Sequence, residues 1–265
     1  MVKIAVSGVG GRMGGRIAAL ALDDPKTYQV VGALEAPGHA ALGQDLGQLL
    51  GRTTTQVVVT DHMPSALGEA QVLIEFTNPA ATIDHARMAA RHGVKLVIGT
   101  TGLTERQMRE LPRLAKKIPI LYAPNMSFGV YILRRALREV ALCYQQLGPA
   151  ALTIEMMETH HKMKKDKPSG TAKQLRDDLH AILVEHDIPI QSRREGEVVG
   201  EHTVTFTHGH DQLVLTHRAT SRDTFAKGAL FAARLLAMIS KPKFYTMDLL
   251  WDAVNTTKKR LRSAA

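Results

Sequence analysis

Cysteine and aromatic residues are scarce in this sequence. Among 265 residues there is one cysteine, Cys143, and aromatic side chains make up 5%. A single cysteine excludes an internal disulfide, which fits a protein of the reducing cytoplasm. Cys143 lies in VALCYQQL on an expected helix, where we predict a buried, inert thiol. With so few aromatics, the core must consist mainly of Ala, Val, Leu and Ile, as in an ordinary α/β protein.

Long apolar runs are also missing. No uninterrupted stretch reaches the roughly 18–20 apolar residues that cross a membrane. Near the amino terminus, Arg12, Arg16 and several glycines interrupt the apolar segment that a signal peptide needs. We therefore expect no membrane partner and a cytoplasmic location.

The net charge of +9 leaves a nucleic-acid-binding protein open as an alternative. The basic residues are scattered, however, apart from Lys162–Lys167 and Lys258–Arg262. No zinc-ligand spacing and no aromatic-rich sheet motif accompanies them. A small anionic ligand explains the charge equally well, and we predict no nucleic-acid partner.

The first half of the chain alternates strand-like and helix-like segments. The pattern predicts strands at 2–8, 29–35, 71–76, 94–102 and 119–125, and helices at 16–22 and 81–93. A further helix starts at Thr104, where Gln107 completes a capping box. Repeated strand-then-helix order favours an α/β fold, a Rossmann-type doubly wound parallel sheet with helices on both faces. In such folds the carboxyl ends of the strands carry the sites.

The pattern changes after Asn125. It predicts helices at 127–148, 171–186 and 225–240, a strand at 151–158, and an antiparallel hairpin of 201–208 and 211–220 joined by Gly209-His210. We expect an α+β domain with a mixed sheet, inserted into the doubly wound domain or following it.

The segment GVGGRMG after the first strand is the first chemical signal. Its glycines fit G-x-x-G-x-x-G at Gly8, Gly11 and Gly14, which would let the backbone approach a pyrophosphate at a helix start. A glycine-rich structural turn is an equally good interpretation of the motif alone. Glu35, which ends the second strand, can accept hydrogen bonds from the adenosine ribose. Because Ala36 offers no cation for a 2′-phosphate, we predict that NADH is preferred over NADPH.

Three other strand ends carry small or polar residues. They are Phe76-Thr77-Asn78, Gly99-Thr100-Thr101-Gly102 and Ala123-Pro124-Asn125-Met126. Each alone would be an ordinary turn. Because all three fall on one expected sheet edge, we predict that they line the nicotinamide half of a dinucleotide.

The segment ETHHKMKKDKPSGTA combines two histidines, four lysines and a turn. If the strand before it ends near Met157, His160 and His161 lie on a loop that faces a cleft, with Lys164 in reach. Ser169, Gly170 and Thr171 then form a helix start that can bind carboxylates. A histidine proton donor and a lysine charge partner suit the reduction of an acidic imine or enamine. A solvated basic face is the alternative. We predict no metal, because no third Cys, Asp or Glu shows useful ligand spacing.

These motifs resemble those of the 4-hydroxy-tetrahydrodipicolinate (dihydrodipicolinate) reductase family over nearly the whole chain. The most specific is E-x-H-H-x-x-K-x-D-x-P-S-G-T-A, and GVGGRMG, EFT, GTTG, APNMSFGV, VGEHTVTF and THRATSR follow the family's order. The resemblance implies an NAD(P)H-dependent reductase of lysine and diaminopimelate biosynthesis, with His160 as general acid and Lys164 as its partner. It implies a dicarboxylate substrate bound by His161, Lys164, Ser169, Gly170 and Thr171. The implied cofactor site comprises Gly8, Gly11, Arg12, Met13, Glu35, Phe76, Thr77, Gly99, Thr100, Thr101, Ala123, Pro124, Asn125 and Met126.

The resemblance also implies a domain organisation and an assembly. Residues 1–126, completed by 237–265, would bind the dinucleotide. Residues 127–236 would bind the substrate and form a homotetramer. The chain departs from the family in three respects. The segment 187–200 is short, Ala36 replaces an Arg found in relatives that accept both cofactors, and Lys165 and Lys167 add charge beyond the pattern.

Two other functions stay open from the sequence. Another NAD(P)-dependent dehydrogenase, acting on an amino or keto acid, would have the same architecture. A basic dinucleotide-sensing or nucleic-acid-binding protein would show salt-dependent binding and no turnover.

Overall fold

The chain forms two compact units. The computed structural model describes residues 1–148 and 151–263, with side chains through Thr256. The side chains of the basic segment Lys258–Arg262 are therefore not among those that the structure describes. Unit 1 comprises Met1–Met126 and Phe225–Ala265, and unit 2 comprises Ser127–Thr224.

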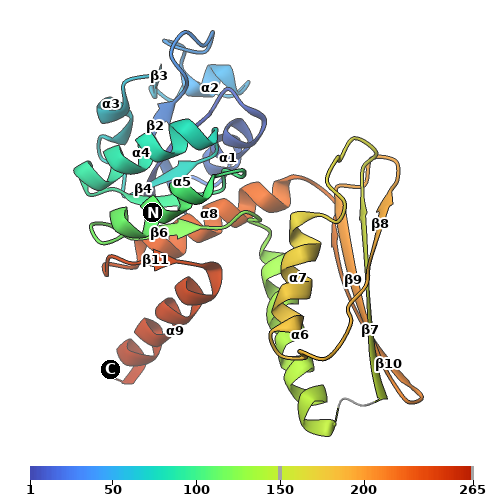
Figure 1. Ribbon diagram of the computed structural model, residues 1–265. Helices are drawn as coiled ribbons and strands as arrows, with labels where there is room; N and C mark the ends of the chain where they lie inside the picture. Colours follow the sequence, from blue (N-terminus) through green and yellow to red (C-terminus); the bar gives the residue numbers. More distant parts are fainter. Residues whose placement is uncertain (149–150, 264–265) are drawn as a thin grey trace. The chain divides into compact units, whose positions relative to one another are not determined.

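Unit 1 is built on a seven-stranded sheet in the order β11-β6-β5-β4-β1-β2-β3 (Figure 1). Every neighbouring pair is parallel. The order of β1 to β6 is that of a Rossmann sheet, which confirms the predicted fold. The strands are β1 (Val2–Ser7), β2 (Tyr28–Leu34), β3 (Val59–Thr60), β4 (Val72–Glu75), β5 (Lys95–Ile98), β6 (Ile120–Tyr122) and β11 (Phe244–Tyr245).

Several helices of unit 1 begin at a residue whose side chain caps them. Asn78 accepts hydrogen bonds from the first amides of α4, and Thr104 with Gln107 forms the predicted capping box of α5. Apolar faces of these helices and strands form a buried core around Leu73, Leu96 and Ile120. The helices are α1 (Arg12–Leu22), α2 (Leu46–Leu49), α3 (Met63–Leu67), α4 (Pro79–His92), α5 (Glu105–Leu114), α8 (Asp223–Ala237) and α9 (Met247–Ser263).

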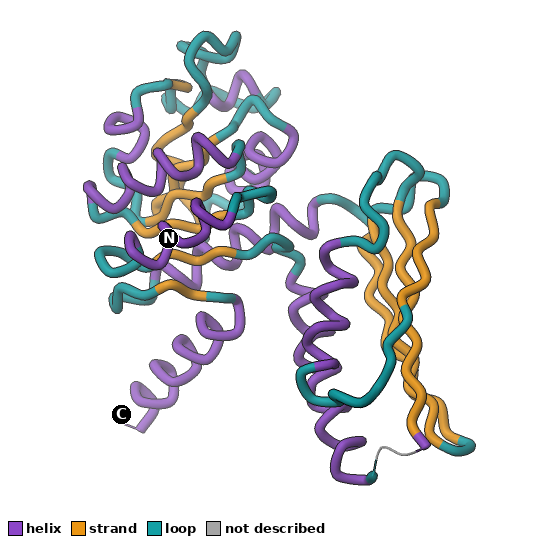
Figure 2. The backbone as a smooth tube through the Cα atoms, in the orientation of Figure 1, coloured by secondary structure: helices purple, strands orange, loops and turns teal. Residues whose placement is uncertain are grey.

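Unit 2 is a four-stranded mixed sheet with helices along one face (Figure 2). Its order is β10-β9-β7-β8, with β7 and β8 parallel and the other pairs antiparallel. Phe206 and Val204 of β9 pack with Leu175 of α7 and Leu137 of α6 in its core. The elements are α6 (Phe128–Leu147), β7 (Leu152–His160), α7 (Gly170–His180), β8 (Ile190–Arg194), β9 (Gly200–His208) and β10 (Asp211–Ala219).

Two features of unit 2 differ from the sequence predictions. Strand β7 continues past Met157 to His160, because Glu158 and Thr159 pair with both neighbouring strands and His160 pairs with Arg194 of β8. His160 therefore ends a strand and does not lie on a loop. The second boundary of unit 2 falls at the start of α8, whereas the sequence put it near the end of that helix.

Cys143 is exposed, so the prediction of a buried thiol was wrong. The buried face of α6 includes Leu133, Leu137 and Ala141. Cys143 lies two residues after Ala141, which rotates it by about 200° away from that face.

Candidate active site

The glycine turn after β1 brings the backbone close to the start of α1. A Cβ on Gly14 would lie 2.1 Å from the carbonyl oxygen of Gly8, and Gly8 has a φ of 74°. Side chains at these positions would therefore block the turn. Gly11 is the N-cap of α1, and no described side chain caps its first turn. Amides at such a helix start bind phosphate, so Gly8, Gly11, Arg12 and Met13 fit a dinucleotide.

Glu35 lies beside this turn, immediately after β2. Its carboxylate accepts a hydrogen bond from the amide of Gly10 at 2.7 Å and from that of Ala36 at 2.9 Å. Both bonds hold the negative charge next to the glycine turn. This is where a Rossmann domain binds the adenosine ribose.

A second group of predicted cofactor residues follows β4 and β5. The amide of Thr77 donates to the hydroxyl of Thr100 at 3.1 Å, which joins the two strand ends. A Cβ on Gly99 would lie 2.0 Å from the ring of Phe76, so only glycine admits this ring. Thr101 follows on the exposed side.

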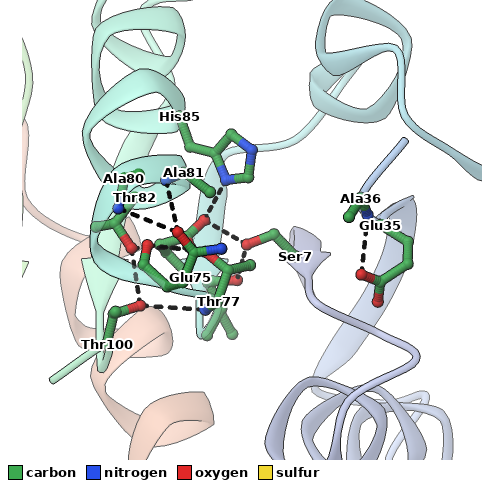
Figure 3. Close-up of polar contacts among 12 residues, drawn as sticks. Ser7, Glu35, Ala36, Glu75, Thr77, Ala80, Ala81, Thr82, His85 and Thr100 are labelled. Carbon is green, nitrogen blue, oxygen red and sulfur yellow. Dashed lines mark hydrogen bonds and ion pairs between the residues drawn. The ribbon is translucent and has the colours of Figure 1, made fainter. Parts of the chain in front are cut away.

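Glu75, which sequence reasoning did not select, organises this edge from within. It is fully buried at the end of β4 and accepts hydrogen bonds from the hydroxyls of Ser7 and Thr77. Thr82 donates to it at 3.2 Å and the Nδ1 of His85 lies 2.7 Å away (Figure 3). These groups come from β1, α4 and the loop after β4, so one carboxylate fixes the positions of several backbone segments.

The residues after β6 complete the predicted cofactor set. The amide of Ala123 bonds to the carbonyl of Ile98 in β5 at 3.1 Å. Ala123 and Met126 are buried, whereas Pro124 is exposed and Asn125 is partly exposed. The structure thus brings the predicted cofactor residues to the carboxyl ends of β1, β2, β4, β5 and β6, or to the loops directly after them.

In unit 2, a buried carboxylate holds the candidate general acid. Glu158 is fully buried and is hydrogen-bonded to the Nδ1 of His160. Its other oxygen accepts from Arg194 at 2.9 Å. Burial opposes its ionisation, but the polar side chains of Ser192 and Arg194 and the nearby His160 outweigh burial, so the pKa of Glu158 lies below its usual value.

His160 is a weakened base in this environment. Burial lowers its pKa from the ordinary value of 6.5, Glu158 opposes that effect, and the charges of Lys164 and Arg194 add to it. His202 of β9 meets His160 edge to face, with ring centres 5.2 Å apart. Burial and the neighbouring His160 lower the pKa of His202 to about 4, so His202 is neutral near pH 7.

The start of α7 already binds a carboxylate. Asp166 lies 2.8 Å from the Nζ of Lys164. Burial would raise the pKa of Asp166, but Lys164 and the amide of Gly170 hold it below its usual value. Ser169 is the N-cap of α7: its buried hydroxyl accepts from the amide of Ala172 at 3.2 Å and lies 3.3 Å from the Nε2 of His202. Lys164, Ser169, Gly170 and Thr171 are thus gathered at one helix start.

The remaining members of the basic segment differ in exposure. His161 is partly exposed in the turn after β7, where its carbonyl accepts from the amide of Lys164. Lys162, Lys165 and Lys167 are exposed, as expected for solvated charges.

Glu158, His160 and His202 also have a spacing that a metal ion could use, with ligand atoms within 4.8 Å of one another. Sequence reasoning missed this group because β9 supplies His202 from far along the chain. Arg194 already neutralises Glu158, and Lys164 adds a second cation nearby. This charge balance favours an ion-pair network over a cation site.

Both halves of the chain match models of one family. Residues 2–126 match dihydrodipicolinate reductase, N-terminus, and residues 129–250 match its C-terminus. A 4-hydroxy-tetrahydrodipicolinate reductase of Syntrophobacter fumaroxidans is 36% identical, covering 94% of this chain and 98% of the relative. One from Myxococcus xanthus is 41% identical, covering 89% and 93%.

Solved structures show the same fold. A dipicolinate-bound dihydrodipicolinate reductase from a Paenisporosarcina species has a TM-score of 0.76 at 21% identity, covering 93% of this chain and 97% of its own. GenD2 from gentamicin A biosynthesis, in complex with NAD, has a TM-score of 0.64 at 14% identity, covering 99% and 94%. Among the described residues, no helix is long and apolar enough to span a bilayer.

Proposed function

This chain belongs to the dihydrodipicolinate reductase family, and we propose that it reduces 4-hydroxy-tetrahydrodipicolinate to tetrahydrodipicolinate with NAD(P)H, in lysine and diaminopimelate biosynthesis. One observation carries the proposal. A histidine held by a buried carboxylate lies close to Lys164 and to a helix start that binds a carboxylate. A dicarboxylate heterocycle needs both features, because it must be held by its anionic groups and protonated on its ring.

The residues of unit 2 divide the chemistry as follows. Lys164 and the amides of Gly170 and Thr171 bind a substrate carboxylate in place of that of Asp166, and His161 contributes a further polar contact. Ser169 keeps the start of α7 in shape through its bond to Ala172. His160 donates one proton as the ring loses water and is reduced. The imidazolium that donates this proton is oriented through its Nδ1 by Glu158.

The residues of unit 1 hold the dinucleotide. Its pyrophosphate fits the glycine turn at Gly8 and Gly11 with Arg12 and Met13, and its nicotinamide fits the joined ends of β4, β5 and β6. When bound, NAD(P)H supplies the hydride. The second proposed catalytic group, Lys164, keeps the substrate carboxylate in place while the ring accepts that hydride.

We further propose that NADH is preferred. The carboxylate of Glu35, anchored by Gly10, would accept from ribose hydroxyls and repel a 2′-phosphate. Ala36 supplies no compensating cation. We also propose a homotetramer in the cytoplasm, formed through the sheet of unit 2, where Leu213 and Val214 of β10 are 40% and 50% exposed.

Steady-state assays of NAD(P)H oxidation and of NAD(P)+ reduction test these proposals. The 4-hydroxy-tetrahydrodipicolinate substrate should give NAD(P)H oxidation, whereas aspartate or diaminopimelate should give no NAD(P)+ reduction. The value of kcat/KM should be higher with NADH than with NADPH. Glu35→Gln should reduce the ratio of these two values. Turnover with an amino acid but not with 4-hydroxy-tetrahydrodipicolinate would support the alternative function, an NAD(P)-dependent dehydrogenase of amino or keto acids. A tenfold advantage for NADPH would overturn the cofactor assignment.

A further inference from the structure

Arg194 is the last residue of β8 and lies in the short segment 187–200. None of the roles proposed above is assigned to this segment. The side chain of Arg194 is 7% exposed. The Nη1 donates to Glu158 at 2.9 Å, and the Nε donates to the carbonyl of Lys164 at 3.1 Å. The Nη2 donates to the carbonyl of Asp166, and the Nη1 also reaches the carbonyl of Arg193 at 2.6 Å.

These contacts reach both proposed catalytic groups. Glu158 uses one oxygen for Arg194 and the other for the Nδ1 of His160, so the guanidinium fixes the carboxylate that orients the imidazole. The carbonyls of Lys164 and Asp166 belong to the loop that presents the lysine. Strand pairing reinforces the arrangement, since His160 lies opposite Arg194 in the parallel register of β7 and β8.

We propose that Arg194 is a positioning residue, whose single guanidinium orients His160 through Glu158 and holds the loop that carries Lys164. The inference rests on the proposed function for the roles of those two residues. It depends on the planar fork of arginine, whose five donors can serve a carboxylate and two carbonyls at once. A lysine has one compact charge and cannot reach all three acceptors.

A direct role for Arg194 in substrate binding agrees less well with these contacts. A cation that binds a carboxylate must present a donor to it, and the donors described here already face protein oxygens. Removing the guanidinium of Arg194 should therefore lower the rate of the chemical step more than the affinity for a dicarboxylate.

The kinetic test compares Arg194→Gln with Arg193→Gln, a matched control on the exposed neighbouring arginine. We expect Arg194→Gln to lower kcat about tenfold to a hundredfold, the cost of displacing catalytic groups by up to an ångström. The KM for NADH should stay within twofold, and Arg193→Gln should behave as wild type. Arg194→Lys, which keeps the charge and protects folding, should recover part of kcat. A kcat for Arg194→Gln within threefold of wild type would overturn the proposal.

A double-mutant cycle shows whether Arg194 acts through His160. In a His160→Gln background, Arg194→Gln should cost far less than in the wild type, because the group that it orients is gone. An equal fold-loss in both backgrounds would contradict the proposal.

A turnover-independent measurement separates this inference from the proposed function. The Nδ1 proton of His160, bound to Glu158, should give a low-field NMR resonance that Arg194→Gln removes or shifts and Arg193→Gln does not. If wild type showed no turnover, the proposed function would fail, and this resonance would still decide the role of Arg194. An unchanged resonance in Arg194→Gln would overturn it.

Discussion

Each unit of this protein buries a glutamate near the end of a strand, and the two carboxylates accept hydrogen bonds from different kinds of donor. Glu75 in unit 1 binds the Nδ1 of His85 and three hydroxyl groups, whereas Glu158 in unit 2 binds the Nδ1 of His160 and the guanidinium of Arg194. Hydroxyl donors come from several backbone segments and fix their positions. A cationic donor instead keeps the carboxylate charged beside the acid histidine. Under the proposed function, one glutamate organises the cofactor-binding surface, and the other organises proton transfer.

The largest expected effect sharpens this contrast from the side of unit 2. His160→Ala and Lys164→Ala should each reduce kcat by at least about a hundredfold, because each removes an acid or an oriented charge. Steady-state kinetics with NADH would measure this. Lys165→Ala, which removes an exposed charge from the same segment, should have little effect. Near-normal turnover in either of the first two variants, or a severe loss in the third, would contradict the assignment.

Glu75→Gln tests the contrast from the side of unit 1. An amide in place of the carboxylate leaves buried donors without an acceptor, so the free energy of unfolding should fall by about 1–3 kcal/mol. The KM for NADH should rise while the affinity for dipicolinate stays constant, measured by kinetics and calorimetry. Glu69→Gln, on an exposed glutamate paired with Lys3, should leave all three quantities unchanged. A loss of dipicolinate affinity in Glu75→Gln would break the distinction between the two glutamates.

A smaller effect concerns His202, the neutral neighbour of His160. Its folded pKa of about 4 lies below the ordinary 6.5, so the unfolded chain takes up the proton first as pH falls. The stability that His202 contributes is thus present above pH 6.5 and is lost toward pH 4. This accounts for about 2 kcal/mol between pH 7 and pH 5.

Denaturant unfolding at the two pH values would measure this contribution. His202→Gln should lose stability less steeply than wild type as pH falls. His210→Gln, at an exposed turn, should follow wild type. Equal slopes for wild type and His202→Gln would show that the histidine is not buried neutral as described.

The sequence alone predicted most of the fold, because strand-helix alternation and caps are local signals. The Rossmann sheet, the capping box at Thr104 and the hairpin at Gly209 are all confirmed. Strand β8 was missed because IQSRR is short and polar, and β3 and β11 have two residues each. His160 was placed on a loop because the length of β7 depends on pairing with β8 and β9.

The site was only partly predictable for a related reason. Glycine turns and the basic segment around Lys164 are contiguous, so they are visible in the sequence. Arg194 and His202 reach Glu158 and His160 through strand pairing, as the register of β7 with β9 sets His202 opposite Glu158. The role of Glu75 likewise depends on residues from β1 and α4. No local pattern encodes such contacts, since burial and register decide them.

The central claim is that His160 protonates a dicarboxylate held beside it, and its imidazole titration tests this most directly. NMR with the resonance assigned by His160→Gln would give the pKa of His160 without and with dipicolinate. Burial and the nearby cations should hold the free value below 6.5, and the bound dicarboxylate should raise it. A pKa that does not change at saturating dipicolinate, or a failure of dipicolinate to bind, would contradict the account.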